Sequence, residues 1–217
     1  MKITWLGHSS FRLEESTGTT VVTDPYHSNV GYDMPATEAD IVTVSHKHED
    51  HNNVENISGA PTVITRAGAY EIGGVHILGS HTFHDDSKGA QRGDNIVFKY
   101  RMDGVDVCHM GDIGEECNAI LVEMLMPVNV LLIPVGGTYT IDAKQAKEYV
   151  DRIMPDVVIP MHYKTKDCDF DIDKVGEFLD LFDDENIVYV DGASVDFDRA
   201  DFDGEETKVF VLEKVSK

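Results

Sequence analysis

The stretch that decides the fold is His46-Lys47-His48-Glu49-Asp50-His51, which follows the β-branched run at residues 41–45. A short run of this kind is typical of a buried strand, so the polar stretch occupies the loop at the strand's carboxyl end. Within six residues this loop carries imidazole and carboxylate side chains, the groups that bind zinc and its divalent neighbours. The sequence therefore predicts a metal centre at the end of a buried strand.

The spacing within this stretch favours two ions rather than one. Alternation by two turns His46 and His48 toward one ion, and we expect Asp50 and His51 to face a second. Two ions about 3.5–4 Å apart share a water molecule, lower its pKa and polarise a substrate oxygen. We expect two divalent ions, with Zn²⁺ first and Mn²⁺, Fe²⁺ or Ni²⁺ as alternatives. A histidine-rich surface loop without metal is the competing interpretation.

The composition is that of a folded globular protein. The chain has 217 residues, 41% of them hydrophobic and 27% charged, and we expect a single domain over residues 1–217. Its three cysteines are odd in number and form no C-x-x-C pattern, which favours a reducing compartment. The N-terminus lacks the features of a signal peptide, and no apolar run approaches the roughly 18 residues of a membrane helix. A cytoplasmic protein with no membrane partner is expected.

The charge is the unusual bulk property. Forty acidic residues against 18 basic ones give a formal net charge of −22. A field of this sign repels nucleic acid and anionic membrane surfaces, unless a basic patch overrides it within a Debye length of about 8 Å. We therefore expect a small-molecule substrate and no nucleic-acid partner, and the sequence leaves the oligomeric state open.

Strands dominate the first half of the chain. Beside residues 41–45, they are expected at residues 3–6, 11–13, 20–23, 62–65, 69–72, 75–78, 95–101 and 105–110. The second half alternates, with helices at 116–126, from Asp142 to the residue before Pro155, and at 175–182. The intervening strands are expected at 130–135, 157–161, 187–190 and 208–212. Hairpins followed by βαβ-like units predict an α/β fold of two packed sheets with helices outside.

Two more candidate ligands also follow expected strands. Asp112 comes after residues 105–110, and His162 comes after residues 157–161. Because open α/β sheets bind ligands at the carboxyl ends of their strands, both are expected near His46. A turn aspartate and a core histidine are the alternative interpretations of Asp112 and His162.

The run H-x-H-x-D-H resembles the signature of the metallo-β-lactamase superfamily. The resemblance implies a four-layer αββα sandwich with a dinuclear site between the sheets, Asp112 as the bridging ligand and His162 as the last histidine. His84 is preferred over His81 as the third histidine of the first ion, because Asp85 and a glycine-rich run at 89–95 follow it. The expected metal ligands are His46, His48, Asp50, His51, His84, Asp112 and His162.

Further stretches resemble the L-ascorbate-6-phosphate lactonase-like group, which also has kinship to phospholipase-D-type hydrolases of N-acyl-phosphatidylethanolamine. They are Trp5-Leu6-Gly7-His8-Ser9-Ser10-Phe11, Thr23-Asp24-Pro25, Gly111-Asp112-Ile113-Gly114, residues 134–142 and Ile159-Pro160-Met161-His162-Tyr163. The resemblance covers residues 2–166, and the last fifty residues carry no motif.

Several residues are expected to surround the metals. Asp24 resembles a carboxylate that accepts the free ring N–H of a ligand histidine or a loop amide; an Asp-Pro turn is its alternative. His8 is a candidate proton donor or substrate contact, with a structural histidine as the alternative. Arg92, Tyr139 and Lys164 are expected to rim the cleft, where Arg92 or Lys164 would meet an anionic group. Solvated loop residues are the alternative for these three.

These features predict a hydrolase in which a metal-bridging hydroxide cleaves an ester, lactone or phosphodiester of a small molecule. Asp50 would hold the hydroxide's metal and take its proton, with His8 as the second catalytic candidate. The turn at Gly7-His8-Ser9-Ser10 lacks the G-x-S-x-G elbow of serine hydrolases. A glyoxalase-II-like thioesterase and an iron-dependent redox enzyme of the same fold are alternatives, although the diiron enzymes have Glu in place of His48. An RNA-processing nuclease fits less well because no basic surface is evident.

Overall fold

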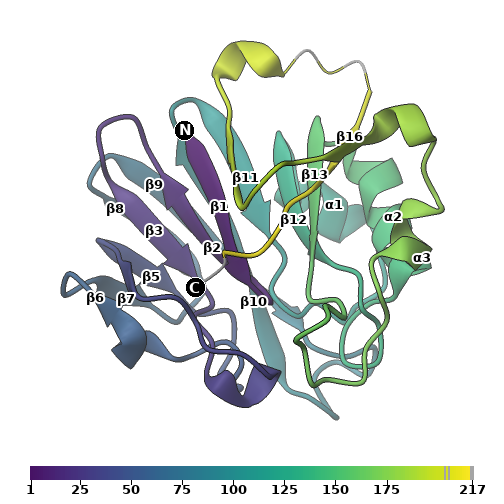
Figure 1. Cartoon of the computed structure of the whole chain (residues 1–217), viewed down its shortest axis with the longest axis horizontal. Coiled ribbons are helices and arrows are strands. Elements are labelled where there is room, and N and C mark those ends of the chain that lie inside the picture. The colour runs from purple at the N-terminus through teal and green to yellow at the C-terminus, as the bar shows by residue number, and fades with distance from the viewer. Residues whose placement is uncertain (203, 205, 216–217) are drawn as a thin grey trace.

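Two β-sheets pack against each other in the computed structural model, which describes residues 1–202, 204 and 206–215 (Figure 1). In spatial order, the six-stranded sheet consists of β15 (Ser194–Asp196), β1 (Lys2–Gly7), β2 (Ser10–Glu14), β3 (Thr20–Thr23), β5 (Ile41–Thr43) and β7 (Thr62–Ile64). The eight-stranded sheet consists of β14 (Ile187–Tyr189), β16 (Lys208–Val211), β13 (Val157–Met161), β12 (Val130–Pro134), β11 (Val105–His109), β10 (Asp94–Met102), β9 (Val75–Phe83) and β8 (Gly68–Ile72).

Within the eight-stranded sheet, the strand pairing changes from antiparallel to parallel along the chain, as the sequence predicts; in the other sheet, β5 pairs parallel with both β3 and β7, which the expected hairpins did not include. Neighbouring strands from β8 to β11 pair antiparallel, whereas β11, β12 and β13 pair parallel. The crossovers between the parallel strands carry α1 (Ala119–Leu125) and α2 (Ala143–Ile153). Helix α2 has the predicted capping box: Asp142 accepts the Gln145 N–H at 2.8 Å, and Gln145 accepts the Asp142 N–H at 3.0 Å.

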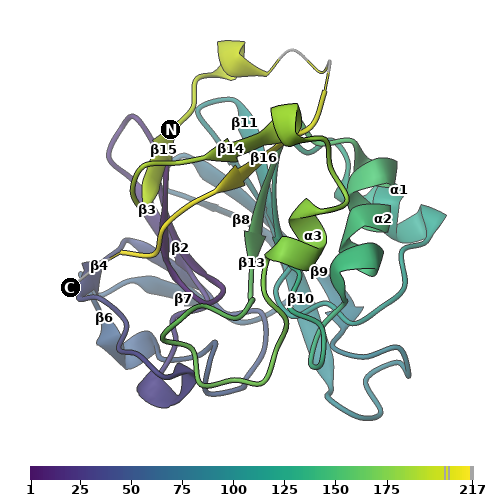
Figure 2. The same ribbon diagram turned by 45° about the vertical axis from the view of Figure 1, so that its right-hand side comes forward.

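Helices lie outside the eight-stranded sheet. Figure 2 shows α1, α2 and the single-turn α3 (Gly176–Leu179) stacked on that side. The other sheet is covered by short elements: η1 (Ser28–Val30), η2 (Val54–Asn56) and a small sheet of β4 (Thr37–Glu38) and β6 (Ile57–Ser58). A second hydrophobic cluster seals this face, where Val22 and Val42 pack with Tyr26 and Val30. The metallo-β-lactamase fold is confirmed, with one outer layer made of short turns.

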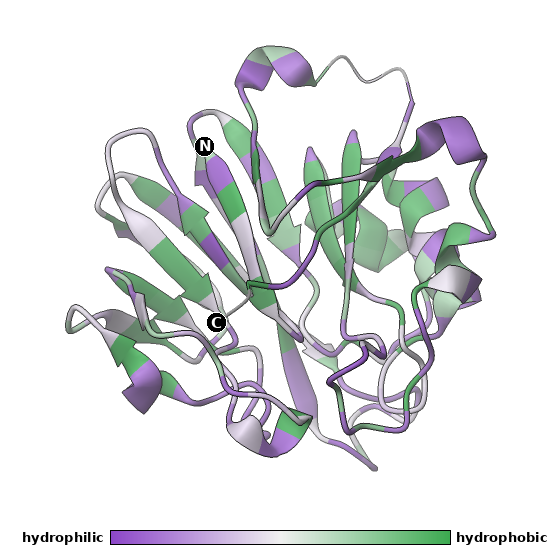
Figure 3. Cartoon of the chain, viewed as in Figure 1, coloured by the Kyte–Doolittle hydropathy of each residue, from purple (hydrophilic) through white to green (hydrophobic). Residues whose placement is uncertain are grey.

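The main core lies between the sheets and beneath the helices. Figure 3 shows the strands as the most hydrophobic parts of the chain. Phe11 and Ile41 from one sheet and Phe98 and Tyr100 from the other are fully buried in one cluster. Each such aliphatic or aromatic side chain contributes roughly 1.5–3 kcal/mol on burial. Polar contacts between the sheets are made within this core, as in the 2.6 Å hydrogen bond between Thr43 and Tyr100.

The last fifty residues contribute to both sheets. β16 lies between β13 and β14, and β15 pairs antiparallel with β1 at the edge of the other sheet. The helix expected at 175–182 is shorter, because Gly176 weakens its start and Asp180 places negative charge at its carboxyl end. None of the helices in the described ranges is long and apolar enough to span a bilayer.

Candidate metal centre

The predicted ligands all lie at one end of the sandwich, in the loops at the bottom of Figure 1. His8 follows β1, Asp24 follows β3, and the stretch from His46 to His51 comes three residues after β5. In the other sheet, the ligands follow three strands: His84 comes after β9, Asp112 after β11 and His162 after β13. The two sheets thus place six loops around one point, which is the arrangement that strand-end polar residues predict.

Asp112 occupies the middle of this cluster. Its Oδ2 lies 3.1 Å from Nε2 of His51 and 3.3 Å from Nε2 of both His84 and His162. Nε2 of His46 is 3.9 Å from the same oxygen. One carboxylate oxygen therefore contacts histidines of both predicted sites, as a bridging ligand requires.

The candidate ligand atoms form three overlapping groups, each with its atoms within 4.8 Å of one another, and the third group (Asp24, His46 and His51) shares one histidine with each of the other two. The first group contains His46, His48 and His84, and the second contains His8, Asp50, His51 and His162. In the second group, Asp50 Oδ2 lies 3.2 Å from His8 Nε2 and 3.5 Å from His51 Nε2. The grouping follows the predicted division of the ligands, with His8 added to the second group.

The donor atoms fit divalent cations. Nε2 of His46, His51 and His162 and Oδ1 of Asp112 are buried and have no hydrogen-bond partner. A buried polar group left without a partner costs about 1–3 kcal/mol, so four of them together require a ligand of opposite character. Burial and neighbouring histidines lower the pKa of His8 to about 4 and of His46 to about 3. Both imidazoles are therefore neutral at pH 7, as metal binding requires.

The electrostatics at His51 also favour a cation. Burial acts to lower its pKa, but the carboxylates of Asp112 and Asp50 raise the pKa of His51 well above its ordinary value. In return, burial acts to raise the pKa of Asp112, while His162 and His51 hold it well below its usual range. Several carboxylate oxygens thus face one imidazole in a buried site, where a bound cation would balance their charge.

Asp24 orients two of the histidines, as the sequence predicts. Nδ1–H of His51 donates to Asp24 Oδ2 at 2.8 Å, which turns Nε2 toward Asp112. The Ser45 hydroxyl donates to the same oxygen at 2.5 Å and lies 2.9 Å from Nδ1 of His46. The Ser45 N–H donates to Asp24 Oδ1 at 2.7 Å. One buried carboxylate therefore fixes the rings of both His46 and His51.

Backbone strain marks the same residues. His8, Asp24 and His162 have φ values of 50°, 39° and 52°, in the left-handed region that side chains other than glycine rarely adopt. Such strain persists where the surroundings over-determine the conformation, and it clusters at functional sites. Gly136 is required for a related reason, because a Cβ there would collide with the carbonyl oxygen of His162.

Asn95 is a site residue that sequence reasoning missed. Its side chain is fully buried and accepts the Asp112 N–H at 3.0 Å, while donating to Thr82 at 2.8 Å and to the Met110 carbonyl at 3.0 Å. It holds the turn that carries Asp112, and Gly111 allows the close approach since a Cβ there would meet Asn95 Oδ1. No signal in the sequence indicates this role, because Asn95 is one of several polar residues in β10, beside Asp94, Lys99 and Arg101.

The two rival histidines of β9 and its following loop lie apart. His84 is buried beside Asp112, whereas His81 is 49% exposed and pairs with Asp94 at 3.0 Å. Asp85 organises the loop after His84, because its carboxylate accepts backbone N–H groups from residues 87, 89, 91 and 92 at 2.7–2.9 Å. This geometry supports His84 as the ligand, because the His81 ring lies away from the centre.

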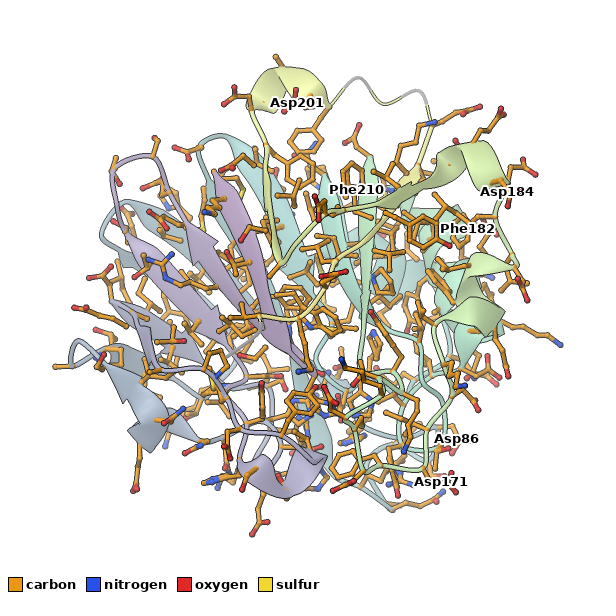
Figure 4. The ribbon with its side chains drawn as sticks, in the orientation of Figure 1. Asp86, Asp171, Phe182, Asp184, Asp201 and Phe210 are labelled. Carbon is orange, nitrogen blue, oxygen red and sulfur yellow. The ribbon has the colours of Figure 1, made fainter. Side chains whose placement is uncertain are left out.

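A small cleft of about 240 Å³ opens onto the cluster. It is lined by His48, Asp50, His84, Arg92, Asp112, Tyr139 and Phe170. Figure 4 labels Asp86 and Asp171 at this end of the molecule and Asp201 at the opposite end. A larger cavity of about 770 Å³ contains none of the predicted ligands and lies among Trp5, Tyr32 and Tyr163.

Arg92 and Tyr139 line the cleft as expected, whereas the expectation for Lys164 needs correction. Lys164 does not line the cleft, because its ammonium group donates to the Phe170 carbonyl and holds the segment that carries the Phe170 ring. His8 is 1% exposed and also lies outside the cleft lining, against His162 at a ring-centroid distance of 4.2 Å. His8 therefore lies beside the candidate ligands, with Nε2 3.2 Å from Asp50 Oδ2, and its catalytic role stays a prediction.

Comparison with known proteins agrees with this geometry. A family model described as a β-lactamase superfamily domain matches residues 2–162. A UPF0173 metal-dependent hydrolase from Methanoregula boonei is 33% identical over 189 residues, which cover 76% of this chain and 83% of the relative. Another from Methanosarcina mazei is 29% identical over 197 residues, covering 77% and 85%.

A solved structure covers nearly the whole chain. The crystal structure of a Thermotoga maritima protein assigned as a zinc-dependent hydrolase of the metallo-β-lactamase superfamily is 43% identical. Its TM-score is 0.82, and the match covers 99% of each chain. The chain belongs to the metallo-β-lactamase superfamily and, within it, to the UPF0173 family of metal-dependent hydrolases.

Proposed function

We propose that this metal-dependent hydrolase holds two divalent ions, Zn²⁺ in the first instance, and cleaves an ester, lactone or phosphodiester bond of a small molecule. The observation that carries the proposal is the position of Asp112, whose Oδ2 contacts Nε2 of His51, His84 and His162 within 3.3 Å. A single carboxylate shared by two sets of histidines is the arrangement of a dinuclear hydrolytic centre. Bound ions of this kind supply an activated water molecule and a Lewis acid for the substrate oxygen.

The chain's own residues then perform three tasks. His46, His48 and His84 hold one ion, with Asp24 fixing the His46 ring through Ser45. The second ion takes its ligands from Asp50, His51 and His162, and Asp112 joins both sites.

Asp50 lines the cleft and has a pKa held below its usual range by His51 and His8 against the effect of burial. Its carboxylate is thus ionised and faces the space where substrate binds, where it orients the attacking water and accepts a proton from it. His8, 3.2 Å from Asp50 Oδ2, positions this carboxylate.

The size of the cleft supports a small-molecule substrate. Its volume of about 240 Å³ lies below the roughly 300–1,000 Å³ of pockets for drug-sized ligands. A net charge of −22 also opposes the approach of nucleic acid, which favours small molecules over RNA. Within the small-molecule class, the motif resemblance favours a lactone of the L-ascorbate-6-phosphate lactonase type as the first substrate to test.

Two alternatives remain as proposals of lower rank. A redox enzyme of the diiron type would have Glu at the position of His48, and here His48 lies with His46 and His84 in the first ligand group. A thioesterase would use the same ligands and differs only in the bond that is cleaved.

The test is a panel of lactone, ester, phosphodiester, thioester and β-lactam substrates, assayed with protein loaded with zinc, manganese or iron. We expect metal-dependent hydrolysis of a lactone, ester or phosphodiester that is lost in Asp50→Asn. His81→Ala is the matched control, because it changes an exposed residue of the adjacent strand. Thioester cleavage alone, or oxygen consumption in the iron form without hydrolysis, would contradict the proposal.

A further inference from the structure

Arg92 is the one cationic side chain that lines the cleft in the described part of the chain. It also lines the adjoining cavity of about 210 Å³, which contains His84, Thr138 and Tyr139. Arg92 thus stands where the two cavities meet, beside the predicted ligands. Its position is unusual in a protein with 40 acidic and 18 basic residues, because most surfaces of such a molecule are negative.

The arginine is held in place from both sides. Its backbone N–H donates to the Asp85 carboxylate at 2.7 Å, which anchors the loop that carries it. One guanidinium N–H donates to the Thr138 carbonyl at 3.1 Å, and the guanidinium carbon lies 4.9 Å from the centroid of the Tyr139 ring. These contacts fix the guanidinium plane while using one of its five N–H donors, so several donors remain for a ligand.

No carboxylate neutralises this arginine. Arg12, Arg101 and Arg152 each form an ion pair with a neighbouring acid, at 3.2 Å or less for all three. Within the described residues, Arg92 makes no such pair, although the chain has more than two acids for each base. Arg66 and Arg199 also lack an ion pair among these residues, but both are exposed and lie outside the cleft lining. A preoriented guanidinium without a counter-ion is typical of a site that binds an oxyanion.

We propose that Arg92 selects substrates that carry a carboxylate or phosphate group at a distance from the bond that is cleaved. The inference rests on the proposed hydrolytic function and names the substrate class. The guanidinium binds the oxyanion through two parallel N–H donors, while the scissile bond lies at Asp50 and Asp112, which line the same cleft. Tyr139 and Phe170, whose ring centroids are 6.1 Å apart, provide an apolar wall for the short linker between the two ends.

Equilibrium binding tests this directly with three probes that differ only at one end: valerate, glutarate and 4-phosphonobutyrate. Calorimetry is done on the zinc-loaded protein, its Arg92→Gln and Arg92→Lys variants, and Arg66→Gln. Arg66→Gln is the matched control, since it removes the same charge from an exposed position outside the cleft.

We expect the native protein and Arg66→Gln to bind at least one of the dianionic probes about 10- to 100-fold more tightly than valerate, the range of a charge-assisted hydrogen-bond pair. Comparing the affinities for glutarate and 4-phosphonobutyrate shows whether the site prefers a carboxylate or a phosphonate. Arg92→Gln should lose this preference and keep its affinity for valerate, and Arg92→Lys should retain part of it. The proposal would be overturned if the Arg92→Gln variant kept the native preference for glutarate or 4-phosphonobutyrate over valerate. It would also be overturned if the native protein showed no such preference. An equal loss for all three probes would show a merely structural role and would overturn it as well.

The 4-nitrophenyl esters of the same acids separate this inference from the proposed function. If the binding preference depends on Arg92 but none of the three esters is hydrolysed, ester hydrolysis fails as the activity and the anion site stands. If all three esters are hydrolysed with kcat/KM ratios that Arg92→Gln leaves unchanged, hydrolysis stands and the role of Arg92 fails.

Discussion

Oδ2 of Asp112 lies 3.1 Å from Nε2 of His51, and both side chains are closed to solvent. The other nitrogen of the same ring is held by Asp24 at 2.8 Å, so His51 is fixed between two buried carboxylates. A proton or a divalent ion on Nε2 satisfies this arrangement, and only the ion also satisfies the unpaired nitrogens of His46 and His162. The predictions below follow from that relationship.

Asp112→Asn should separate metal binding from folding. Without metal, the stability is expected to change little, because the desolvation cost of a buried carboxylate roughly offsets its attraction to His51. The metal affinity and the turnover should fall by at least about 10–100-fold, the effect seen when even the supporting groups of a metal site are changed, and the stabilisation by added metal should shrink accordingly. Calorimetry and hydrolysis on the same preparations check this. If Asp112→Asn kept the native metal binding and turnover, Asp112 would be only a turn aspartate.

His84→Ala should lower the metal content and abolish hydrolysis, whereas His81→Ala should retain both ions. His84 Nε2 lies 3.3 Å from Asp112, while His81 pairs with Asp94 at the surface. Elemental analysis of the two purified variants gives the answer. If His81→Ala loses metal and His84→Ala keeps it, the assignment of the third histidine is wrong.

Asp24→Asn tests the orientation of the ligand rings. An amide keeps the shape of the side chain, but its NH2 group cannot accept, so it cannot serve both the Ser45 backbone N–H at one oxygen and the His51 N–H at the other as the carboxylate does. Metal affinity should fall by about 10–100-fold, as for other groups that support metal ligands. Competition with a chelator measures the loss, and Asp40→Asn, a carboxylate that accepts from Thr20 away from the centre, is the control. Equal metal affinities in Asp24→Asn and Asp40→Asn would show that Asp24 does not support the metal ligands.

Asp85→Asn should weaken the loop that carries His84 and Arg92, with a defined pH dependence. Burial acts to raise the pKa of Asp85, but the four backbone donors lower it below its ordinary value. A carboxylate with a lowered folded pKa stabilises the protein above its unfolded pKa of about 3.9, and this contribution is lost as pH falls through the folded pKa.

The stability difference between the native protein and Asp85→Asn should therefore be largest near neutral pH and shrink below about pH 4. Thermal unfolding of metal-free protein in a chelator checks it, with Asp86→Asn as the neighbouring exposed control. A difference that grows toward acid would contradict the role of Asp85.

Local patterns predicted much of the fold, and the candidate ligands that they singled out lie in one cluster. The run from His46 to His51 defined the loop after a buried strand, and Asp142 with Gln145 defined the start of α2. The short strand β15 was not predicted, because its three residues are stabilised by pairing with β1 rather than by their own pattern. The role of Lys164 was wrong for a similar reason, since its partner is a backbone carbonyl of Phe170 that no spacing rule indicates.

The supporting groups of the site were predicted less well than the ligands. Asp24 was expected from its resemblance to a known pattern, whereas Asn95 was not, because one polar residue in a strand carries no information about the loop that it contacts. Close approaches such as Gly136 against His162 depend on where two strands end relative to each other in space. Such contacts depend on tertiary packing, which local sequence patterns do not encode.

The central claim, a dinuclear centre bridged by Asp112, is tested most directly by a crystal structure of the zinc-soaked protein with anomalous scattering data. We predict two peaks about 3.5–4 Å apart, the separation of a two-metal hydrolytic site. Oδ2 of Asp112 should contact both ions, with His46, His48 and His84 around one and Asp50, His51 and His162 around the other. A single peak that does not involve Asp112, or no peak at all, would contradict the account.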